Sequence, residues 1–350
     1  MSACFRLPEL RDLTETHLRA FERGGDKQSL NSAIHYALES LEIPTEDSHL
    51  RFNCLHLASR AFLHRFQLSK NQRDLDAALR WGKEAVQSRP QDDPDRLVCL
   101  IEVTNALLVR YELMQSAQDL EEAVCWSKEL LLLCPEDDPE TRVQILWTLT
   151  ASLRSSFSEN DNADELDELI GHYKDLVSLC DEDNPLCAPS YYHLAHACKT
   201  RYEGSNDSSH LEDAVNFASS ALIMHHEGHP HRRECLDDLG EVMLMQYKIT
   251  SDPSDVYAAI AMFEEALELC SDSPHDSAYL KATIKLSGAL FVRWKDFGDE
   301  EAMKRTEKIC EHALRGCRRD HSLRPLVISL LENAKTVLRG KEKHSSSTGG

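Results

Sequence analysis

An aromatic residue recurs about every 45 positions along this chain, and no other feature limits the possible folds so strongly. It stands at Phe21, Phe66, Tyr111, Phe157, Tyr202, Tyr247 and Trp294. A constant period between about 20 and 50 residues is typical of stacked copies of one supersecondary unit. The sequence therefore predicts a protein of seven repeats, in which the aromatic serves as a fixed reference position.

The residues before the aromatic predict one helix in each repeat. Eight positions earlier stand Leu13, Ala58, Val103, Leu149, Leu194, Leu239 and Leu286, and seven positions earlier stand Thr14, Ser59, Thr104, Thr150, Ala195, Gly240 and Ser287. Further apolar columns lie eleven and four positions before the aromatic. These offsets form one stripe of an α-helix. The small residues in one column allow two helices to approach closely.

A second helix is predicted after a short polar turn. Nine positions past the aromatic stand Leu30, Leu75, Leu120, Leu166, Leu211, Val256 and Met303, and twelve positions past it stand Ala33, Ala78, Ala123, Leu169, Ala214, Ala259 and Thr306. Eight positions past the aromatic, the side-chain oxygens of Ser29, Asp74, Asp119 and Asp255 are expected to cap the first turn of this helix. Each repeat is therefore predicted to be a helix hairpin.

Arginine directly precedes the aromatic in four repeats, at Arg65, Arg110, Arg201 and Arg293. Carboxylates recur ten positions past the aromatic, at Asp76, Glu121, Asp167 and Glu212. We expect these two columns to form ion pairs that join the helices of a hairpin. A ladder of ligand-binding arginines is the alternative. A partly exposed ion pair of this kind contributes only about 0–1 kcal/mol.

The pattern resembles the tetratricopeptide repeat (TPR). The sixth repeat carries the match, with Leu236, Leu239-Gly240 and Met243 on the first helix and Ala259 and Ala266 on the second. The first helix and the turn are longer than in that family, and this long form is similar to the arrays of fungal proteins associated with CHAT-type, caspase-like domains. The resemblance covers roughly residues 10–318. The chain has no His-Gly dipeptide and no Gln-Ala-Cys segment, so a CHAT peptidase domain is not expected here.

Together, the columns and the resemblance predict an all-α fold. We expect an α-solenoid (superhelix) of about seven antiparallel helix hairpins with a C-terminal capping helix. The expected organisation is a frayed N-terminus over residues 1–9, the TPR-like solenoid with its capping helix over residues 10–339, and a disordered tail over residues 340–350. A solenoid buries its core between neighbouring repeats, so 350 residues need not divide into several globular domains.

The chain is strongly acidic, with 60 Asp and Glu residues against 39 Lys and Arg residues and a net charge of −21. This balance argues against nucleic-acid binding, which requires a basic surface, and against docking on anionic lipid. Two interpretations of the acid remain open. It forms a solvated rim that keeps the repeats soluble, or it attracts a basic partner peptide.

The sequence also bears on location and on thiol chemistry. No apolar run in Met1–Gly25 fits a signal peptide, and no stretch reaches the roughly 18 apolar residues of a membrane span. Of the 12 cysteines, Cys198, Cys270 and Cys310 lie in apolar helical stripes, as expected of small hydrophobic side chains. We therefore expect reduced thiols and a cytoplasmic protein, with the nucleus as the alternative location.

Residues 225–231 contain the densest group of possible metal ligands, four histidines. This segment falls in a turn between repeats, where fixed geometry and second-shell partners are rarely available. His193, His196 and Cys198 lie on one helix but point in different directions. No phosphate-binding loop occurs, and the carboxylates of solvated turns lack the separated pKa values that acid–base catalysis needs. We therefore expect no metal, no cofactor, no small-molecule substrate and no enzymatic activity.

The resemblance implies that the first helices line an inner, concave wall that takes a peptide. The wall residues expected to bind a partner are Trp147, Tyr192, Arg60, Asn105, Arg154, His196 and Lys199. The two aromatics are typical interface anchors, and the polar residues suit a ligand with apolar side chains and a carboxylate. Burial of Trp147 and Tyr192 as ordinary core is an equally weighted alternative.

The predicted function is a non-enzymatic scaffold or adapter that binds a peptide or protein segment in the concave groove. The alternative is a regulatory or sensor subunit that controls a caspase-like, CHAT-type effector supplied by another chain. Fold alone does not decide between them.

Overall fold

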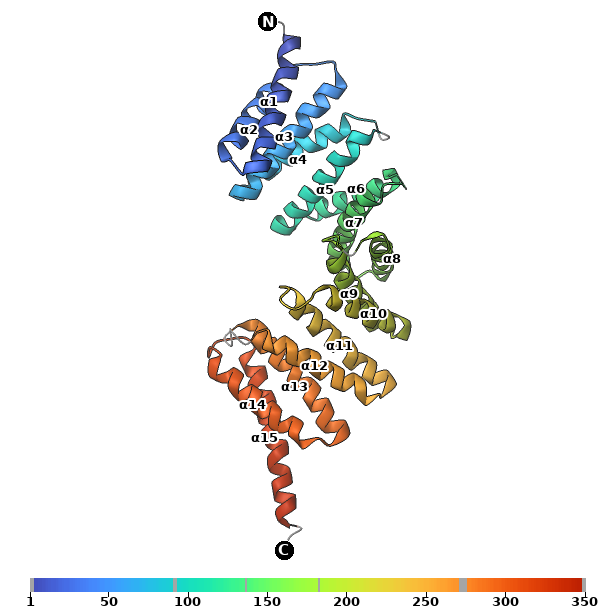
Figure 1. The fold of residues 1–350 in the computed structure, drawn as a ribbon, viewed down its shortest axis with the longest axis vertical. Helices are drawn as coiled ribbons and strands as arrows, with labels where there is room; N and C mark the ends of the chain where they lie inside the picture. Colours follow the sequence, from blue (N-terminus) through green and yellow to red (C-terminus); the bar gives the residue numbers. More distant parts are fainter. Residues whose placement is uncertain (1–2, 91–92, 136, 182, 271–275, 348–350) are drawn as a thin grey trace. The chain divides into compact units, whose positions relative to one another are not determined.

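The computed structural model describes residues 3–90, 93–135, 137–181, 183–270 and 276–347, and all regular elements in these ranges are α-helices (Figure 1). The chain divides into two compact units, Met1–Leu179 (unit 1) and Cys180–Gly350 (unit 2). Among the described residues, no helix is long and apolar enough to cross a membrane. The expected all-α class of stacked helix hairpins is confirmed.

Unit 1 consists of four helix hairpins. Its helices are α1 (Ala3–Gly24), α2 (Lys27–Leu41), α3 (Ser48–Ser69), α4 (Gln72–Gln87), α5 (Pro94–Met114), α6 (Ala117–Leu133), α7 (Pro139–Asn160) and α8 (Ala163–Leu179). Each odd-numbered helix packs on the helix that follows it, and α2, α4 and α6 pack on the first helix of the next hairpin. The first helices α1, α3, α5 and α7 also contact one another in order, as expected of stacked repeats.

Unit 2 consists of three hairpins and one final helix. Its helices are α9 (Cys187–Ser205), α10 (Ser208–Met224), α11 (Arg232–Thr250), α12 (Pro253–Glu268), α13 (Ser277–Phe297), α14 (Glu300–Gly316) and α15 (Arg324–Ser347). Here too the first helices α9, α11 and α13 contact one another in order. The final helix α15 packs on α13 and α14, as expected of a capping helix.

The turn inside each hairpin has the same two-residue geometry in all seven repeats. Its first residue has a left-handed backbone and stands four positions past the aromatic, at Gly25, Lys70, Gln115, Asp161, Asn206, Ser251 and Gly298. The N–H group of this residue donates to the carbonyl of the aromatic residue, for example over 2.7 Å from Gln115 to Tyr111. This bond satisfies a carbonyl that the end of the first helix would otherwise leave without a partner.

The second helix begins three positions earlier than the sequence predicted. The side chains that cap its N–H groups stand five positions past the aromatic, at Asp26, Asn71, Ser116, Asn162, Asp207, Asp252 and Asp299. The expected caps Ser29, Asp74, Asp119 and Asp255 lie in the first turn instead. Asp and Ser suit both places, so residue type alone could not fix the boundary.

The arginine before the aromatic does tie the hairpin together, but through a different carboxylate from the one expected. Arg65 pairs with Asp74 at 2.6 Å. Arg110 donates two hydrogen bonds to Asp119, at 2.8 and 2.6 Å. Arg110 also contacts Asp76, at 3.1 Å, but this residue belongs to the preceding repeat. Because Asp74 and Asp119 are buried, the arginine satisfies carboxylates that water hardly reaches.

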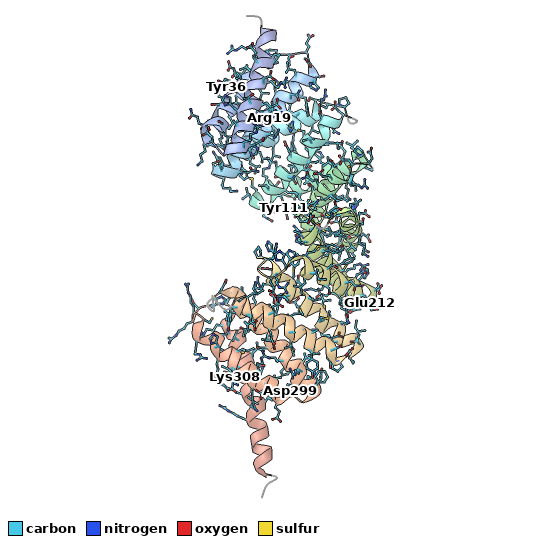
Figure 2. All side chains as sticks on the ribbon, in the orientation of Figure 1. Arg19, Tyr36, Tyr111, Glu212, Asp299 and Lys308 are labelled. Carbon is cyan, nitrogen blue, oxygen red and sulfur yellow. The ribbon has the colours of Figure 1, made fainter. Side chains whose placement is uncertain are left out.

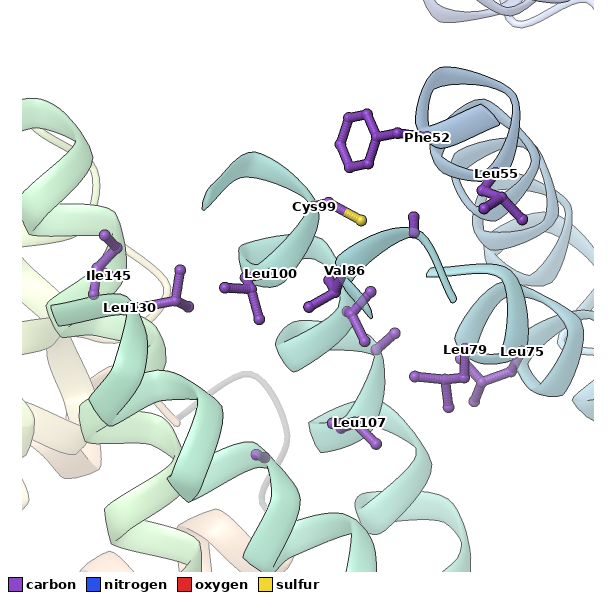
Figure 3. Packing of buried hydrophobic residues seen from close by; sticks show 14 of the residues in the cluster. Phe52, Leu55, Leu75, Leu79, Val86, Cys99, Leu100, Leu107, Leu130 and Ile145 are labelled. Atoms are coloured by element: carbon purple, nitrogen blue, oxygen red, sulfur yellow. The ribbon is translucent and has the colours of Figure 1, made fainter. Parts of the chain in front are cut away.

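The predicted helical stripes form the core. In unit 1, buried side chains of α3 to α7 meet in one cluster that includes Phe52, Leu79, Leu100 and Ile145 (Figure 3). The column eight positions before the aromatic is buried in every repeat except the first, where Leu13 is 40% exposed because no helix precedes α1 in the described chain. The predicted burial of Cys198, Cys270 and Cys310 is confirmed.

A second arginine column, not anticipated from the sequence, joins consecutive hairpins. It stands fifteen positions before the aromatic, near the start of the first helix. Three of its members donate to a carbonyl in the last turn of the preceding second helix: Arg51 to Leu41, Arg96 to Val86 and Arg232 to Leu222, over 3.1 to 3.3 Å. Each also pairs with a glutamate of its own second helix, Glu84, Glu129 or Glu265. One guanidinium thus contacts two hairpins.

The same contact shows that α15 is an eighth copy of the first helix. Arg324 donates to the carbonyl of Leu314 over 3.1 Å. Arg232, which stands two hairpins earlier, donates to the carbonyl of Leu222 in the same way. Counting fifteen positions from Arg324, the place of the aromatic is taken by Arg339. The period therefore continues into the capping helix, although the aromatic that reveals it elsewhere is missing.

Both ends of the chain are more helical than expected. Helix α1 begins at Ala3, within the predicted frayed segment 1–9, and buries Leu7. Helix α15 continues to Ser347, past residue 339 where we expected the capping helix to end. Residues 341–343 (Lys-Glu-Lys) are good helix formers, which accounts for the continuation. Residues 1–2 and 348–350 of the predicted termini lie outside the described ranges.

Candidate functional site

In unit 1, the predicted partner-binding residues lie on the row of first helices. Trp147 on α7 is half-buried, whereas Asn105 on α5 and Arg154 on α7 are exposed. The hydroxyl of Thr148 donates to the side-chain oxygen of Asn105 over 3.3 Å. Arg154 lies close to the buried Tyr173, whose pKa is raised by burial. The structure therefore leaves Asn105 and Arg154 accessible to a partner.

Arg60, by contrast, is already held by carboxylates of the neighbouring repeats. Its guanidinium lies 2.6 Å from Glu22 of the first repeat and 3.4 Å from Glu102 of the third. His56 and His64 contact the same two glutamates, at 2.9 and 3.2 Å. This cluster joins three repeats by ion pairs and leaves little positive charge for a ligand carboxylate.

In unit 2, Tyr192 lines a cavity at the start of α9. The cavity measures about 280 Å³ and is lined by Pro189, Tyr192, His193, His225, His231 and Glu234. Its lining consists of one tyrosine, three histidines and a proline, with the carboxylate of Glu234 as the acidic group. Tyr192 is half-buried, and burial together with the nearby carboxylate of Asp238 raises the pKa of its hydroxyl. A half-buried aromatic beside an open cavity is typical of an anchor position.

Beside this cavity, three helices present a network of charged side chains, which we call the unit 2 wall. It comprises Lys199 on α9, Arg233, Glu234, Asp237, Asp238 and Glu241 on α11, and Lys285 on α13. The ammonium of Lys199 lies 2.5 Å from Glu241 and 3.8 Å from Asp238. Lys199 is therefore buried in ion pairs, while the neighbouring His196 is exposed.

The remaining ion pairs of the unit 2 wall complete the network. Lys285 contacts Glu241 at 2.8 Å and Asp237 at 3.5 Å. Arg233 contacts Asp237 at 3.0 Å and Glu234 at 2.5 Å. Each of the three cations is thus shared between two carboxylates, as in a surface ion-pair network rather than a set of isolated pairs.

Burial and charge shift the pKa values of this network in opposite directions. Burial raises the pKa of Asp237, against the opposing effect of Lys285 and Arg233. For Glu241, burial would raise the pKa, but hydrogen bonds from Lys199 and Lys285 outweigh it, so the pKa is lowered. For Lys199, burial would lower the pKa, but Glu241 outweighs it and the pKa is raised. Near neutral pH these side chains of Lys199 and Glu241 are therefore charged.

Three carboxylate oxygens of the unit 2 wall have no hydrogen-bond partner. They are Oε2 of Glu234, Oδ1 of Asp237 and Oδ2 of Asp238, and all three atoms are buried. The wall holds four carboxylates against three cations, so one negative charge is in excess. The sequence analysis expected Lys199 to meet a ligand carboxylate, but α11 supplies its partners, Asp238 and Glu241.

The four histidines of residues 225–231 do lie close together, in the loop between α10 and α11. The ring centres of His225 and His229 are 4.4 Å apart, and those of His229 and His231 are 5.8 Å apart. Nδ1 of the buried His225 lies 2.8 Å from the carbonyl of Ala221 and 3.4 Å from the sulfur of Cys235. Within the described ranges, no three His, Cys, Asp or Glu side chains are arranged to hold a metal ion.

Sequence reasoning did not select the acidic residues of α11 as site residues. Asp237 and Glu241 do occupy the wall-facing columns, ten and six positions before the aromatic. The missed signal was their like charge four positions apart, which is repeated by Glu234 and Asp238. Like charges at this spacing are mildly destabilising on a helix, and here they are compensated by Lys199, Arg233 and Lys285.

Comparison with known proteins supports the fold. No protein-family model matches the chain, and no curated protein matches its sequence. A signal-transduction ATPase (STAND protein) of Pyrococcus horikoshii with a tetratricopeptide-repeat sensor matches with a TM-score of 0.55 and 12% identity, over 94% of this chain and 50% of that chain. This likeness confirms the expected TPR-like array.

Two further solved structures are similar at lower scores. The apo form of RapI matches with a TM-score of 0.49 and 12% identity, over 97% of this chain and 99% of that chain. The nuclear import adaptor Nro1 of S. pombe matches with a TM-score of 0.46 and 16% identity, over 80% of this chain and 98% of that chain.

Proposed function

We propose that the chain is a non-enzymatic interaction scaffold that binds a peptide or protein segment on its first helices, with Tyr192 as an anchor. The observation that carries the proposal is the cavity of about 280 Å³ beside Tyr192, next to a row of polar side chains on α9 and α11. A side chain of a partner would fill the cavity with its apolar part, while the exposed His196 would contact the partner's backbone. Trp147, Asn105 and Arg154 form a second, separate set of candidates in unit 1.

Selection from a random library of displayed 12-residue peptides tests this proposal directly. Peptides selected on the wild-type protein should lose at least tenfold in affinity for Tyr192→Ala, because the anchor supplies a large share of the binding energy. Tyr257→Ala is the matched control, since Tyr257 is 47% exposed on α12 and lies outside the cavity. Fluorescence anisotropy measures the affinities, and circular dichroism verifies the fold of each variant.

The outcomes separate the anchor from the core interpretation. A large loss of melting temperature in Tyr192→Ala would show that the residue is core, because truncating a buried aromatic costs about 3–5 kcal/mol. Selected peptides that bind Tyr192→Ala as well as wild type would place the binding surface elsewhere. Trp147→Ala, tested in the same way, decides the role of the unit 1 residues.

A second candidate is a sensor or regulatory subunit that acts on an effector carried by another chain. The likeness to a STAND protein with a TPR sensor motivates it, as does the resemblance to CHAT-associated arrays. Both proposed functions, the scaffold and the sensor, would use the same surface on the first helices. An effector domain that co-purifies with the wild-type chain and changes activity when the chain is added would favour the sensor; a partner without activity would favour the scaffold.

A further inference from the structure

On the acidic face of α11, the ion-pair network has one carboxylate more than it has cations. Glu234, Asp237, Asp238 and Glu241 repeat at helical spacing and lie among three cations only. Glu234 and Asp238, like Asp237 and Glu241, are like charges four positions apart, an arrangement that destabilises an isolated helix. A fourth cation would balance the wall.

Unused hydrogen-bonding capacity lies on the same face. Oδ1 of Asp237 has no partner, and this residue is only 5% exposed. Oε2 of Glu234 and Oδ2 of Asp238 are likewise unpaired. An unpaired buried carboxylate oxygen costs free energy that a hydrogen bond from a cationic group would recover. Because each cation of the wall already contacts two carboxylates, a further cationic donor would come from outside the network.

The cavity beside Tyr192 provides a route for such a group. It is lined by rings and by Pro189, and Glu234 stands in its wall with 37% of its side chain exposed. A lysine or arginine side chain has an apolar stem that suits the ring-lined part and a charged head that suits the carboxylate. The face of Tyr192 would add a cation–π contact.

We propose that the unit 2 wall binds a basic segment of a partner protein, with one Lys or Arg side chain of that segment in the Tyr192 cavity and its charged head at Glu234, four positions before Asp238 on α11. This inference rests on the proposed function and specifies its partner by charge. The net charge of −21 favours the encounter with a basic segment.

The test uses the peptides selected from the displayed 12-residue library. Peptides whose binding depends on Tyr192 should contain Lys or Arg. Replacement of the Lys or Arg that occupies the Tyr192 cavity by Gln should weaken binding at least tenfold. The variant Glu234→Gln/Asp238→Asn should weaken binding at least tenfold as well, without loss of melting temperature, because the repulsion removed on α11 offsets the lost contacts to Arg233 and Lys199. The matched control Glu212→Gln/Glu268→Gln neutralises two exposed carboxylates of unit 2 and should change affinity less than twofold (Glu212 is labelled in Figure 2).

Each alternative outcome has a defined meaning. Tyr192-dependent peptides without Lys or Arg would overturn the basic partner while leaving the scaffold function intact. An equal loss of affinity in both double variants would show general electrostatic attraction rather than a site. A lower melting temperature in Glu234→Gln/Asp238→Asn would show that these carboxylates are structural. Failure to select any Tyr192-dependent peptide would contradict the proposed function itself.

Discussion

Replacing Gly240 by alanine tests how closely the two helices of the sixth hairpin approach. A Cβ atom on Gly240 would lie 2.6 Å from Cε1 and 2.7 Å from Cζ of Phe263, whereas ordinary contacts begin at 3.4 Å. Phe263 is 1% exposed and packs in the cluster with Val256, Ile260 and Leu286, so its ring has little room to withdraw. Overpacking of this kind costs about 1–3 kcal/mol.

The helix propensity of alanine opposes this cost. Alanine is more favourable than glycine inside a helix by about 0.5–1 kcal/mol. We therefore expect Gly240→Ala to lose about 0.5–2 kcal/mol in net stability. The matched control is Gly288→Ala in α13 of the same unit, where an added Cβ meets no atom within 4 Å. The control should gain about 0.5–1 kcal/mol, since only the propensity change operates.

Hydrogen exchange with mass spectrometry resolves these effects by helix. Exchange in α11 and α12 should become about 2- to 30-fold faster in Gly240→Ala, while the helices of unit 1 stay protected as in wild type, because repeats couple mainly to their neighbours. Adding Phe263→Leu should relieve the clash, with a favourable coupling of at least about 0.5 kcal/mol in a double-mutant cycle. If Gly240→Ala were as stable as Gly288→Ala, the inferred close approach would be wrong.

Three further predictions follow from the turn, the intrahairpin ion pair and the histidine loop. Ser251→Gly should stabilise unit 2 by about 0.5–1 kcal/mol in urea titrations, because Ser251 has a φ of 56°, which glycine adopts without strain; a loss would contradict this. Arg110→Gln should cost about 1–3 kcal/mol in the same assay, because it leaves the buried carboxylate of Asp119 without its bidentate partner; an unchanged midpoint would show that water replaces the arginine. The pKa of His229 is lowered, by burial first and then by the neighbouring histidines. His229 therefore binds a proton more readily in the unfolded chain than in the folded one. Its contribution to the free energy of unfolding is fully present above pH 6.5 and is lost as the pH falls through the lowered pKa. The melting temperature should accordingly fall on acidification to about pH 5, and His229→Gln should show a smaller fall; an equal fall in both would exclude His229 as the cause.

The helices were predictable because burial imposes a helical period on apolar residues. The column seven positions before the aromatic is buried in most repeats, and its small residues, such as Gly240, lie where the helices approach closely. The helix boundaries were less predictable. Asn71 and Asp74 can both cap a helix, and only the left-handed turn at Lys70 decides between them.

The polar contacts could not be predicted in the same way, since their partners lie in other repeats. Arg51 needs the last turn of α2, and Lys199 finds Glu241 on the next first helix. A periodic sequence gives the offset of each column but not which neighbour its side chains reach. For the same reason the sequence did not show that carboxylates of α11 hold Lys199.

The constant two-residue turn has a consequence for how the chain folds. All seven turns inside hairpins are two residues long, whereas the loops between hairpins range from five to eight residues. The two helices of a hairpin therefore meet through contacts of low sequence separation, which form fast and at a small entropic cost. Each hairpin can assemble as its own nucleus before it docks on a neighbour. Variation in length, whether natural or engineered, is then best accommodated in the loops between hairpins, where a longer segment delays docking without changing the nucleus.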